Sequence, residues 1–217
     1  SSGLTTGVSI GNTDISISRQ SGTGYILVDP QTCTNANTDA VTDSFTIIGH
    51  TFNTEDKIYF TTTGSYPGGL SARAYFVYVV DANTFQLCET YKDTQSPANV
   101  VDFTSNPTGT RTFSKINPPL EIVRNNSPIF NLKDVSLVGY DLKFYYDQEF
   151  KNEFVSTGTT TTSFNITTSG VVGSGTSGAK TINYNIALPD KLYYTLGKSG
   201  YISTADTTVQ HYSSIKY

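Results

Sequence analysis

The side chains that could bind a transition metal are few and far apart in this sequence. The chain contains two cysteines, Cys33 and Cys88, and two histidines, His50 and His211. Thiolate and imidazole groups are good zinc and copper ligands, but structural zinc sites take them from closely spaced pairs. The spacing of these four residues matches no such pattern, so we expect no metal site and no cofactor.

Oxygen ligands gather in the polar segment 31–43, which carries Asn35, Asn37, Asp39 and Asp43. This segment could be a calcium loop, but the central glycine and terminal glutamate of an EF-hand are missing. Asn and Asp also favour turns because their side chains bond to nearby backbone groups. We therefore interpret the segment as a solvated loop.

The side chains that could do acid–base or nucleophilic chemistry form no recognisable arrangement. Asp147, Glu149 and Glu153 lie close together, but a glycosidase needs two carboxylates facing each other across a cleft. His50 has no nearby Ser, Cys or acid in the pattern of a triad. The sequence also lacks the Gly-x-Ser-x-Gly and phosphate-loop motifs. We expect no catalytic residues and no enzymatic activity.

Composition excludes two classes of partner. The net charge is −4 and the 14 Lys and Arg residues are scattered, whereas nucleic-acid-binding domains carry a basic stripe. No apolar run is long enough for a membrane helix, and no basic amphipathic helix is visible. The 217 residues include no methionine, so we expect a processed product or a piece of a longer polypeptide.

The clearest structural signal is an alternation of strand-like runs and turns. Residues 57–63, 74–80 and 84–88 are rich in β-branched and aromatic side chains, which favour strands. Turns at residues 64–69 and 81–83 separate them, and the first contains Pro67 with two following glycines. The sequence therefore predicts an all-β fold with a three-stranded meander at its centre.

The remaining strands and the domain boundary follow from the same signals. We predict strands at 14–18, 25–28, 44–48, 99–103, 110–115, 120–123, 163–168 and 181–187. The strand at 25–28 is expected to end at Asp29-Pro30. The proline pair Pro118-Pro119 makes a stiff break, so two tandem β-sandwich or barrel-like domains are expected, at 1–117 and 118–217.

The central segment resembles a known module. The strings IGHTFNTEDKIYFTTTGSYPGGL and YFVYVVDANTFQL are similar to a pattern found in tail-fibre and other virion structural proteins of tailed bacteriophages, marine myoviruses among them. The matching positions are Gly49-His50, residues 55–57, 64–70, 75–80 and 81–87. The resemblance implies a structural component of a virion: a tail fibre, baseplate or neck appendage segment.

A second resemblance lies in the C-terminal half. Residues 188–196, LPDKLYYTL, are similar to a cupredoxin-like module of marine phage structural proteins. In that family a copper-type ligand pattern follows, and its positions fall here on Leu196, Ser199 and Ile202. Leu and Ile cannot bind a metal, so the resemblance implies a sandwich without its metal site. An immunoglobulin-like sandwich fits the strand pattern as well.

Function is therefore expected to be non-enzymatic. The resemblance implies localisation in the virion, with other virion subunits as partners and a homo-oligomer as the assembly. Free thiols at Cys33 and Cys88 are the expectation for a protein assembled in a reducing cytoplasm, while a secreted protein could pair them. The alternative is a carbohydrate-binding or host-adhesion module, in which Tyr66 stacks on a glycan. For Tyr66 itself, packing on its own hairpin is the interpretation that we favour.

Overall fold

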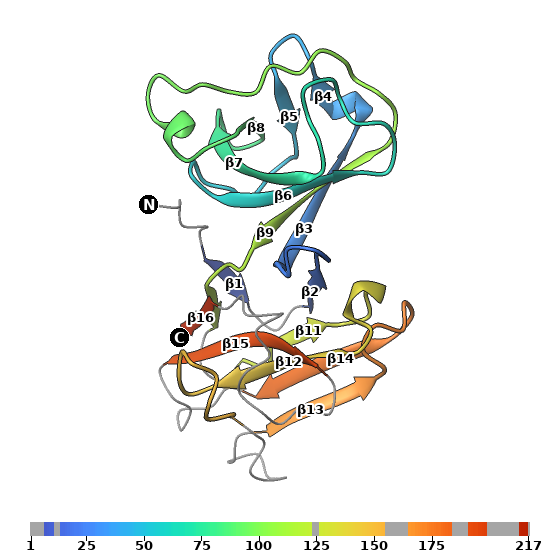
Figure 1. Ribbon diagram of the computed structural model, residues 1–217, viewed down its shortest axis with the longest axis vertical. Helices are drawn as coiled ribbons and strands as arrows, with labels where there is room; N and C mark the ends of the chain where they lie inside the picture. The colour runs from blue at the N-terminus through green and yellow to red at the C-terminus, as the bar shows by residue number, and fades with distance from the viewer. Residues whose placement is uncertain are drawn as a thin grey trace. The chain divides into compact units, whose positions relative to one another are not determined.

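A computed structural model describes residues 7–10, 14–122, 126–154, 165–183, 191–198 and 213–216. These residues form strands and short 3-10 turns, so the protein is all-β, as the sequence predicts. The chain divides into two compact units (Figure 1). Of the described residues, unit 1 contains 30–116, and unit 2 contains 7–29 together with the part from 117 onward. Within the described ranges, no helix has the length and apolar character needed to span a lipid bilayer.

Unit 1 is built on one antiparallel sheet whose centre is the predicted meander. The strands follow the order β3-β9-β6-β7-β8-β5-β4. Their bounds are β3 (Ile26–Thr34, with residues from Pro30 onward in this unit), β4 (Thr38–Asp39), β5 (Ser44–Thr46), β6 (Lys57–Thr62), β7 (Arg73–Val79), β8 (Thr84–Cys88) and β9 (Thr110–Ile116). Two 3-10 turns, η1 (Asn35–Asn37) and η2 (Lys92–Thr94), lie in the connections.

An aromatic core shows that the sheet of unit 1 curls on itself. Phe45 on β5 is fully buried, and its ring centroid lies 5.0 Å from that of Phe113 on β9. In the strand order, β6, β7 and β8 separate these two strands, so the rings meet only if the sheet bends round. The rings of Phe85 and Phe103 lie 5.9 and 5.1 Å from Phe45. The result is a partly open barrel filled by aromatic side chains.

Two strand predictions in this unit were wrong. β3 does not end at Asp29-Pro30 but continues through it to Thr34. Asp29 adopts a left-handed conformation with φ 56°, so the kink that proline marks is taken up inside the strand. Residues 99–103 are not a strand either. Their backbone instead makes isolated bonds: Val101 N–H donates to Leu87 O at 2.8 Å, and Phe103 N–H donates to the Asp43 carboxylate at 3.0 Å.

Unit 2 is a sandwich of two sheets. One sheet has the order β1-β10-β16-β15-β12 and the other has β13-β14-β11-β2, ending on the first residues of β3. The bounds are β1 (Val8–Ile10), β2 (Asp14–Arg19), β10 (Leu120–Ile122), β11 (Ile129–Asn131), β12 (Tyr140–Tyr145), β13 (Asn165–Gly170), β14 (Gly178–Asn183), β15 (Lys191–Lys198) and β16 (Ser213–Lys216). A short 3-10 turn, η3 (Val135–Leu137), precedes β12.

Contacts across the sandwich join the two sheets of unit 2. The rings of Phe130 on β11 and Phe144 on β12 lie 5.7 Å apart, and both side chains are buried. Lys180 on β14 reaches the carboxylate of Asp141 on β12, with 2.9 Å between Nζ and Oδ1. Because Lys180 is buried, this pair fixes one sheet against the other with a charge-assisted contact.

The two units are not in simple tandem, in contrast to the expected ranges 1–117 and 118–217. β2 pairs in parallel with β11, placing Ile15 opposite Phe130, and β1 pairs in parallel with β10, placing Val8 opposite Leu120. Residues 7–29 therefore belong with the C-terminal half of the chain. Parallel pairing between distant segments leaves no local mark in a sequence, whereas the break between 116 and 117 coincides with the predicted boundary beside the proline pair.

Candidate functional site

Two parts of the pattern, the Gly49-His50 step and the turn at 81–83, meet at one end of the meander in unit 1. Asn83 accepts a hydrogen bond at Oδ1 from Gly49 N–H at 2.8 Å, and its carbonyl accepts from Ile47 N–H at 2.8 Å. His50 Nε2 lies 2.9 Å from the carbonyl oxygen of Asp81. The Gly-His step and the Asp-Ala-Asn-Thr-Phe turn are thus bound to each other. We call this set of bonds the motif contact.

The role of His50 is structural. Phe52 N–H donates to Nδ1 at 3.3 Å, so Nδ1 carries no proton and Nε2–H is the donor to Asp81. The imidazole also packs edge-on against Phe85, with 5.3 Å between ring centroids. Phe52 also stacks on the imidazole, with 5.8 Å between ring centroids. Both ring nitrogens and one ring face therefore contact the protein itself.

Glycines of the same pattern allow close backbone approaches. A Cβ atom on Gly64 would lie 1.9 Å from the carbonyl oxygen of Thr108, and one on Gly69 would lie 2.6 Å from that of Asp102. Gly69 also adopts φ 97°, a conformation that favours glycine. Leu70, which ends this turn, is buried in the aromatic core. These residues of the pattern therefore determine local structure in unit 1: the glycines permit close backbone contacts, and Leu70 packs in the core.

Tyr66 packs on its own hairpin, one of the two interpretations that the sequence left open. Its ring lies edge-on to Phe60, with 5.8 Å between centroids, and it is partly buried against the core of unit 1. The packed face is therefore not available to a sugar ring.

Both cysteines are buried free thiols. Burial raises the pKa of Cys33 to about 11, against smaller opposing effects of a hydrogen bond with Thr38 and the charge of Arg111. Burial, with the charge of Asp93, raises the pKa of Cys88 to about 11. Since the thiolate is the reactive form, neither thiol is a nucleophile near neutral pH.

The segment considered as a calcium loop uses its acids to hold turns. Asp39 accepts a hydrogen bond from Val41 N–H at 2.8 Å, and this bond lowers the pKa of its carboxyl group. The Asp43 carboxylate accepts a hydrogen bond from Phe103 N–H. Asn35 and Asn37 lie in η1. Across the described residues, no group of three His, Cys, Asp or Glu side chains could hold a metal ion; His211 lies outside them.

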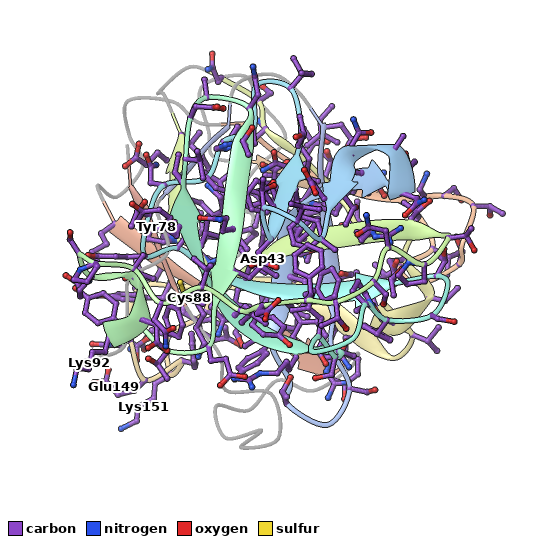
Figure 2. All side chains as sticks on the ribbon, turned by 90° about the horizontal axis from the view of Figure 1, so that it is seen from above. Asp43, Tyr78, Cys88, Lys92, Glu149 and Lys151 are labelled. Carbon is purple, nitrogen blue, oxygen red and sulfur yellow. The ribbon has the colours of Figure 1, made fainter. Side chains whose placement is uncertain are left out.

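The three acids after β12 do not face each other across a cleft. Asp147 accepts hydrogen bonds from the N–H groups of Lys151 and Asn152, at 3.0 and 2.7 Å. Burial raises its pKa, but these bonds outweigh burial and the net pKa is lowered. Glu153 pairs through its backbone with Tyr145, and Glu149 projects into solvent (Figure 2). Asp147 therefore stabilises the turn after β12, and Glu149 is exposed to solvent.

The positions implied by the cupredoxin-like resemblance lie only partly in the described chain. Leu196 on β15 is buried in the core of unit 2 opposite Leu142. Ser199 and Ile202 lie outside the described residues. The one position that the structure describes is therefore a core side chain.

The candidate binding site that sequence reasoning missed is an open groove of about 270 Å³ in unit 1, which we call the acidic groove. Its lining residues are Gly69, Glu89, Asp93, Asn99, Val100, Val101 and Asp102. The groove lies where the loop after β8 returns past the Gly69 turn. The close approach of Gly69 to Asp102 and a hydrogen bond from Thr104 N–H to Gly68 O at 2.9 Å bring these segments together. No sequence motif marks such a meeting of two loops.

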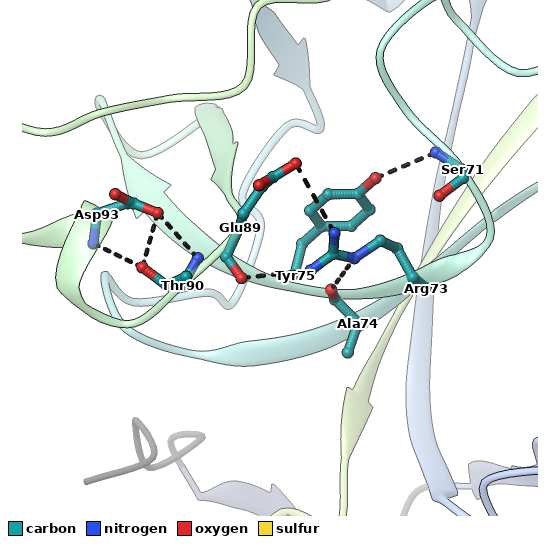
Figure 3. A network of polar contacts seen from close by, with 7 residues as sticks. All are labelled: Ser71, Arg73, Ala74, Tyr75, Glu89, Thr90 and Asp93. Atoms are coloured by element: carbon teal, nitrogen blue, oxygen red, sulfur yellow. Dashed lines mark hydrogen bonds and ion pairs between the residues drawn. The ribbon is translucent and has the colours of Figure 1, made fainter.

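Hydrogen bonds fix Asp93, one of the acids that line this groove. The Thr90 hydroxyl donates to Asp93 Oδ2 at 2.7 Å, and Asn99 Nδ2 donates to Oδ1 at 3.3 Å. These two bonds lower the pKa of Asp93, so its carboxylate is ionised at neutral pH. At the rim, Arg73 stacks on Tyr75 and pairs with Glu89 at 3.7 Å (Figure 3). Such a site offers hydrogen-bond acceptors to hydroxyl groups.

Comparison of the chain with protein-family models, with curated proteins and with solved structures finds no match. The fold and the site together define an all-β protein of two units, one of which carries a shallow acidic groove.

Proposed function

We propose that the protein is a non-enzymatic structural component of a tailed-phage virion, from a tail fibre, baseplate or neck appendage, which provides β-scaffolding and subunit contacts. The observation that carries the proposal is the motif contact. Gly49, His50, Asp81 and Asn83 are among the residues through which the sequence resembles virion proteins. Three hydrogen bonds join them: Gly49 to Asn83, His50 to Asp81, and Asn83 to Asp81. This contact supports the proposal because it gives the residues of the pattern a structural role.

The same contact supports a mechanical role. It joins two loops at the end of a sheet whose interior is filled by aromatic rings, and His50 packs on Phe85 of that interior. Fixed β-modules of this kind transmit force and hold spacing, because each strand is bonded to its neighbours along its length. The loops that they carry supply contacts to other virion subunits.

Peptide mass spectrometry of gradient-purified particles of the phage that encodes this chain tests this proposal. We expect peptides of this chain in the particles, in a fixed ratio to the major capsid protein. Abundant peptides in the infected-cell lysate, with none in the particles, would contradict the proposal.

A second candidate function is carbohydrate binding or host adhesion, and the acidic groove is the observation that favours it. Glu89, Asp93 and Asn99 present acceptors and an amide beside the apolar side chains of Val100 and Val101. Sugars are bound by such combinations of polar groups and apolar surface. The groove is shallow and open, as expected for a site that holds one part of a long glycan.

Glycan-array binding tests the second candidate with three proteins. The wild type is expected to bind a polysaccharide class that Asp102→Asn binds at least tenfold more weakly. Glu149→Gln, which changes an exposed acid of unit 2, serves as the matched control and should bind as the wild type does. Equal binding by all three proteins would exclude the groove as the glycan site.

A further inference from the structure

The terminal strands of the described sheets are β1, β12, β13 and β4. Their outer edges differ in how well they are protected. β4 has two residues and β1 has three, so each offers little edge to another strand. The outer edge of β12 is covered by its own chain, where Phe154 N–H donates to Phe144 O at 2.7 Å and Tyr146 N–H donates to Asn152 O at 2.9 Å. Short strands and covering segments are the usual protection of sheet edges.

Within the part of the chain that the structure describes, β13 lacks this protection. It has six residues, Asn165–Gly170, and among the described strands only β14 pairs with it (Figure 1). The strand contains no charged residue and no proline, which are the other usual means of blocking an edge. Thr167, Thr168 and Ser169 are exposed, so side chains on both faces of the strand meet solvent. With respect to the described strands, the outer N–H and C=O groups of β13 are thus open to a further strand.

We propose that β13 is an assembly surface, and that its partner is β13 of a second copy of this chain, added antiparallel across a two-fold axis. This inference rests on the proposed function, in which copies of the protein assemble. An axis perpendicular to the sheet sets one residue opposite its own copy, Thr167 or Thr168. Threonine pairs across antiparallel strands are favourable, and no like charges meet.

The chemistry of the strand favours a second copy over a charged partner. A strand of another protein with basic or acidic side chains would find no opposite charge on residues 165–170. Self-pairing across a two-fold axis needs only a surface that is complementary to itself. Val171, which follows β13 directly, is 66% exposed and adds apolar area at the end of the strand.

A six-residue edge is a small interface, so the dimer of isolated chains is expected to be weak and to depend on concentration. In an assembly that holds many copies close together, the same contact becomes strong through its high effective concentration. Sheet extension by β13 therefore suits a protein that is joined to its neighbours at other points as well.

Sedimentation velocity over a wide concentration range tests the inference with the full chain. The wild type is expected to shift from monomer to dimer as its concentration rises. Thr168→Lys and Thr167→Lys, which set like charges near each other across the axis, should raise the dissociation constant at least tenfold. Thr108→Lys, an equal change of charge at an exposed loop position of unit 1, should leave it unchanged.

Two results would overturn the inference. The first is a wild type that stays monomeric at the highest concentration, which indicates that another part of the chain or another protein pairs with β13. The second is a dimer that both lysine variants retain. Should the variants fold poorly, amide hydrogen exchange of the wild type decides. Protection of amides in 167–169 that rises with concentration supports the pairing, and constant protection excludes it. Detection of the chain in particles is a separate result, so either proposal can fail alone.

Discussion

His50 donates a hydrogen bond from Nε2 to the carbonyl oxygen of Asp81 at 2.9 Å, across 31 positions of the sequence. The bond joins the loop before β6 to the turn between β7 and β8, and so closes the three-stranded meander of unit 1. His50 therefore stabilises the fold through the hydrogen bonds of its imidazole ring. The same is true of most of the reactive side chains that the structure describes.

Asn83 is expected to stabilise unit 1 through its side-chain oxygen. Asn83→Ala removes the acceptor of Gly49 N–H and should lower the free energy of unfolding by about 1 kcal/mol. Asn83→Asp keeps an acceptor at the same place and should cost clearly less. Urea unfolding of the two variants and the wild type measures the difference. Equal losses in both variants would show that the hydrogen bond is not the cause.

Asp81 is expected to make the stability of the protein depend on pH in the acid range. The N–H of Asn83 donates to its carboxylate at 2.8 Å and lowers its pKa in the folded state. The unfolded chain has the ordinary pKa of about 3.9, so the ionised group stabilises the fold above that pH. The contribution is lost as the pH falls through the lower pKa of the folded state.

Asp81→Asn should therefore flatten the stability profile between neutral pH and about pH 3, where an aspartate would take up its proton. Unfolding midpoints in urea, measured along this range for the variant and the wild type, give the two profiles. Profiles that run parallel over the whole range would contradict the assignment.

Asp56 and Lys115 form a buried ion pair that should be costly to break from one side. Their side chains are 0% and 2% exposed, with 3.9 Å between Oδ2 and Nζ. Lys115→Met leaves the carboxylate of Asp56 buried without its counter-charge, and a loss of about 3–5 kcal/mol in stability is expected. The double variant Asp56→Asn with Lys115→Met should lose less than the sum of the two single variants. Strict additivity in this cycle would show that the two groups are not coupled.

Cys33 and Cys88 should react slowly with thiol reagents in the folded protein. With a pKa of about 11 for each, roughly one thiol in ten thousand is ionised at pH 7, and burial limits access further. We expect no modification by an aromatic disulfide reagent in native buffer and modification of both thiols in urea. Rapid labelling of the native protein would contradict the burial of the thiols.

The sequence was informative where structure is local. The meander of β6, β7 and β8 follows from alternating side chains and from Pro67 and Gly69 in a turn, and these were predicted correctly. The parallel pairing of β2 with β11 was not predictable, because each strand is an ordinary short strand until its distant partner is known. The predicted strand end at Asp29-Pro30 was wrong because β3 continues through these residues, with Asp29 in a left-handed conformation.

The candidate functional residues divide in the same way, into local roles that the sequence predicts and a groove that it does not. The sequence shows no triad partners for His50, favours a solvated loop for Asp39 and Asp43, and favours packing of Tyr66 on its own hairpin. The hydrogen bonds and ring contacts give each of them a structural role. The acidic groove could not be found from sequence, because it arises where two loops meet rather than from a spaced motif. Its one local signal is Gly69, which permits the close approach to Asp102.

Immunogold electron microscopy tests the proposed role most directly. Antibodies raised against the folded protein would be applied to intact phage particles and to particles with detached tails. We predict gold at regular positions on the tail, its fibres or its neck, and none on empty capsids. Antibodies that bind the protein in infected-cell lysate but leave the particles unlabelled, with tails intact or detached, would contradict the account.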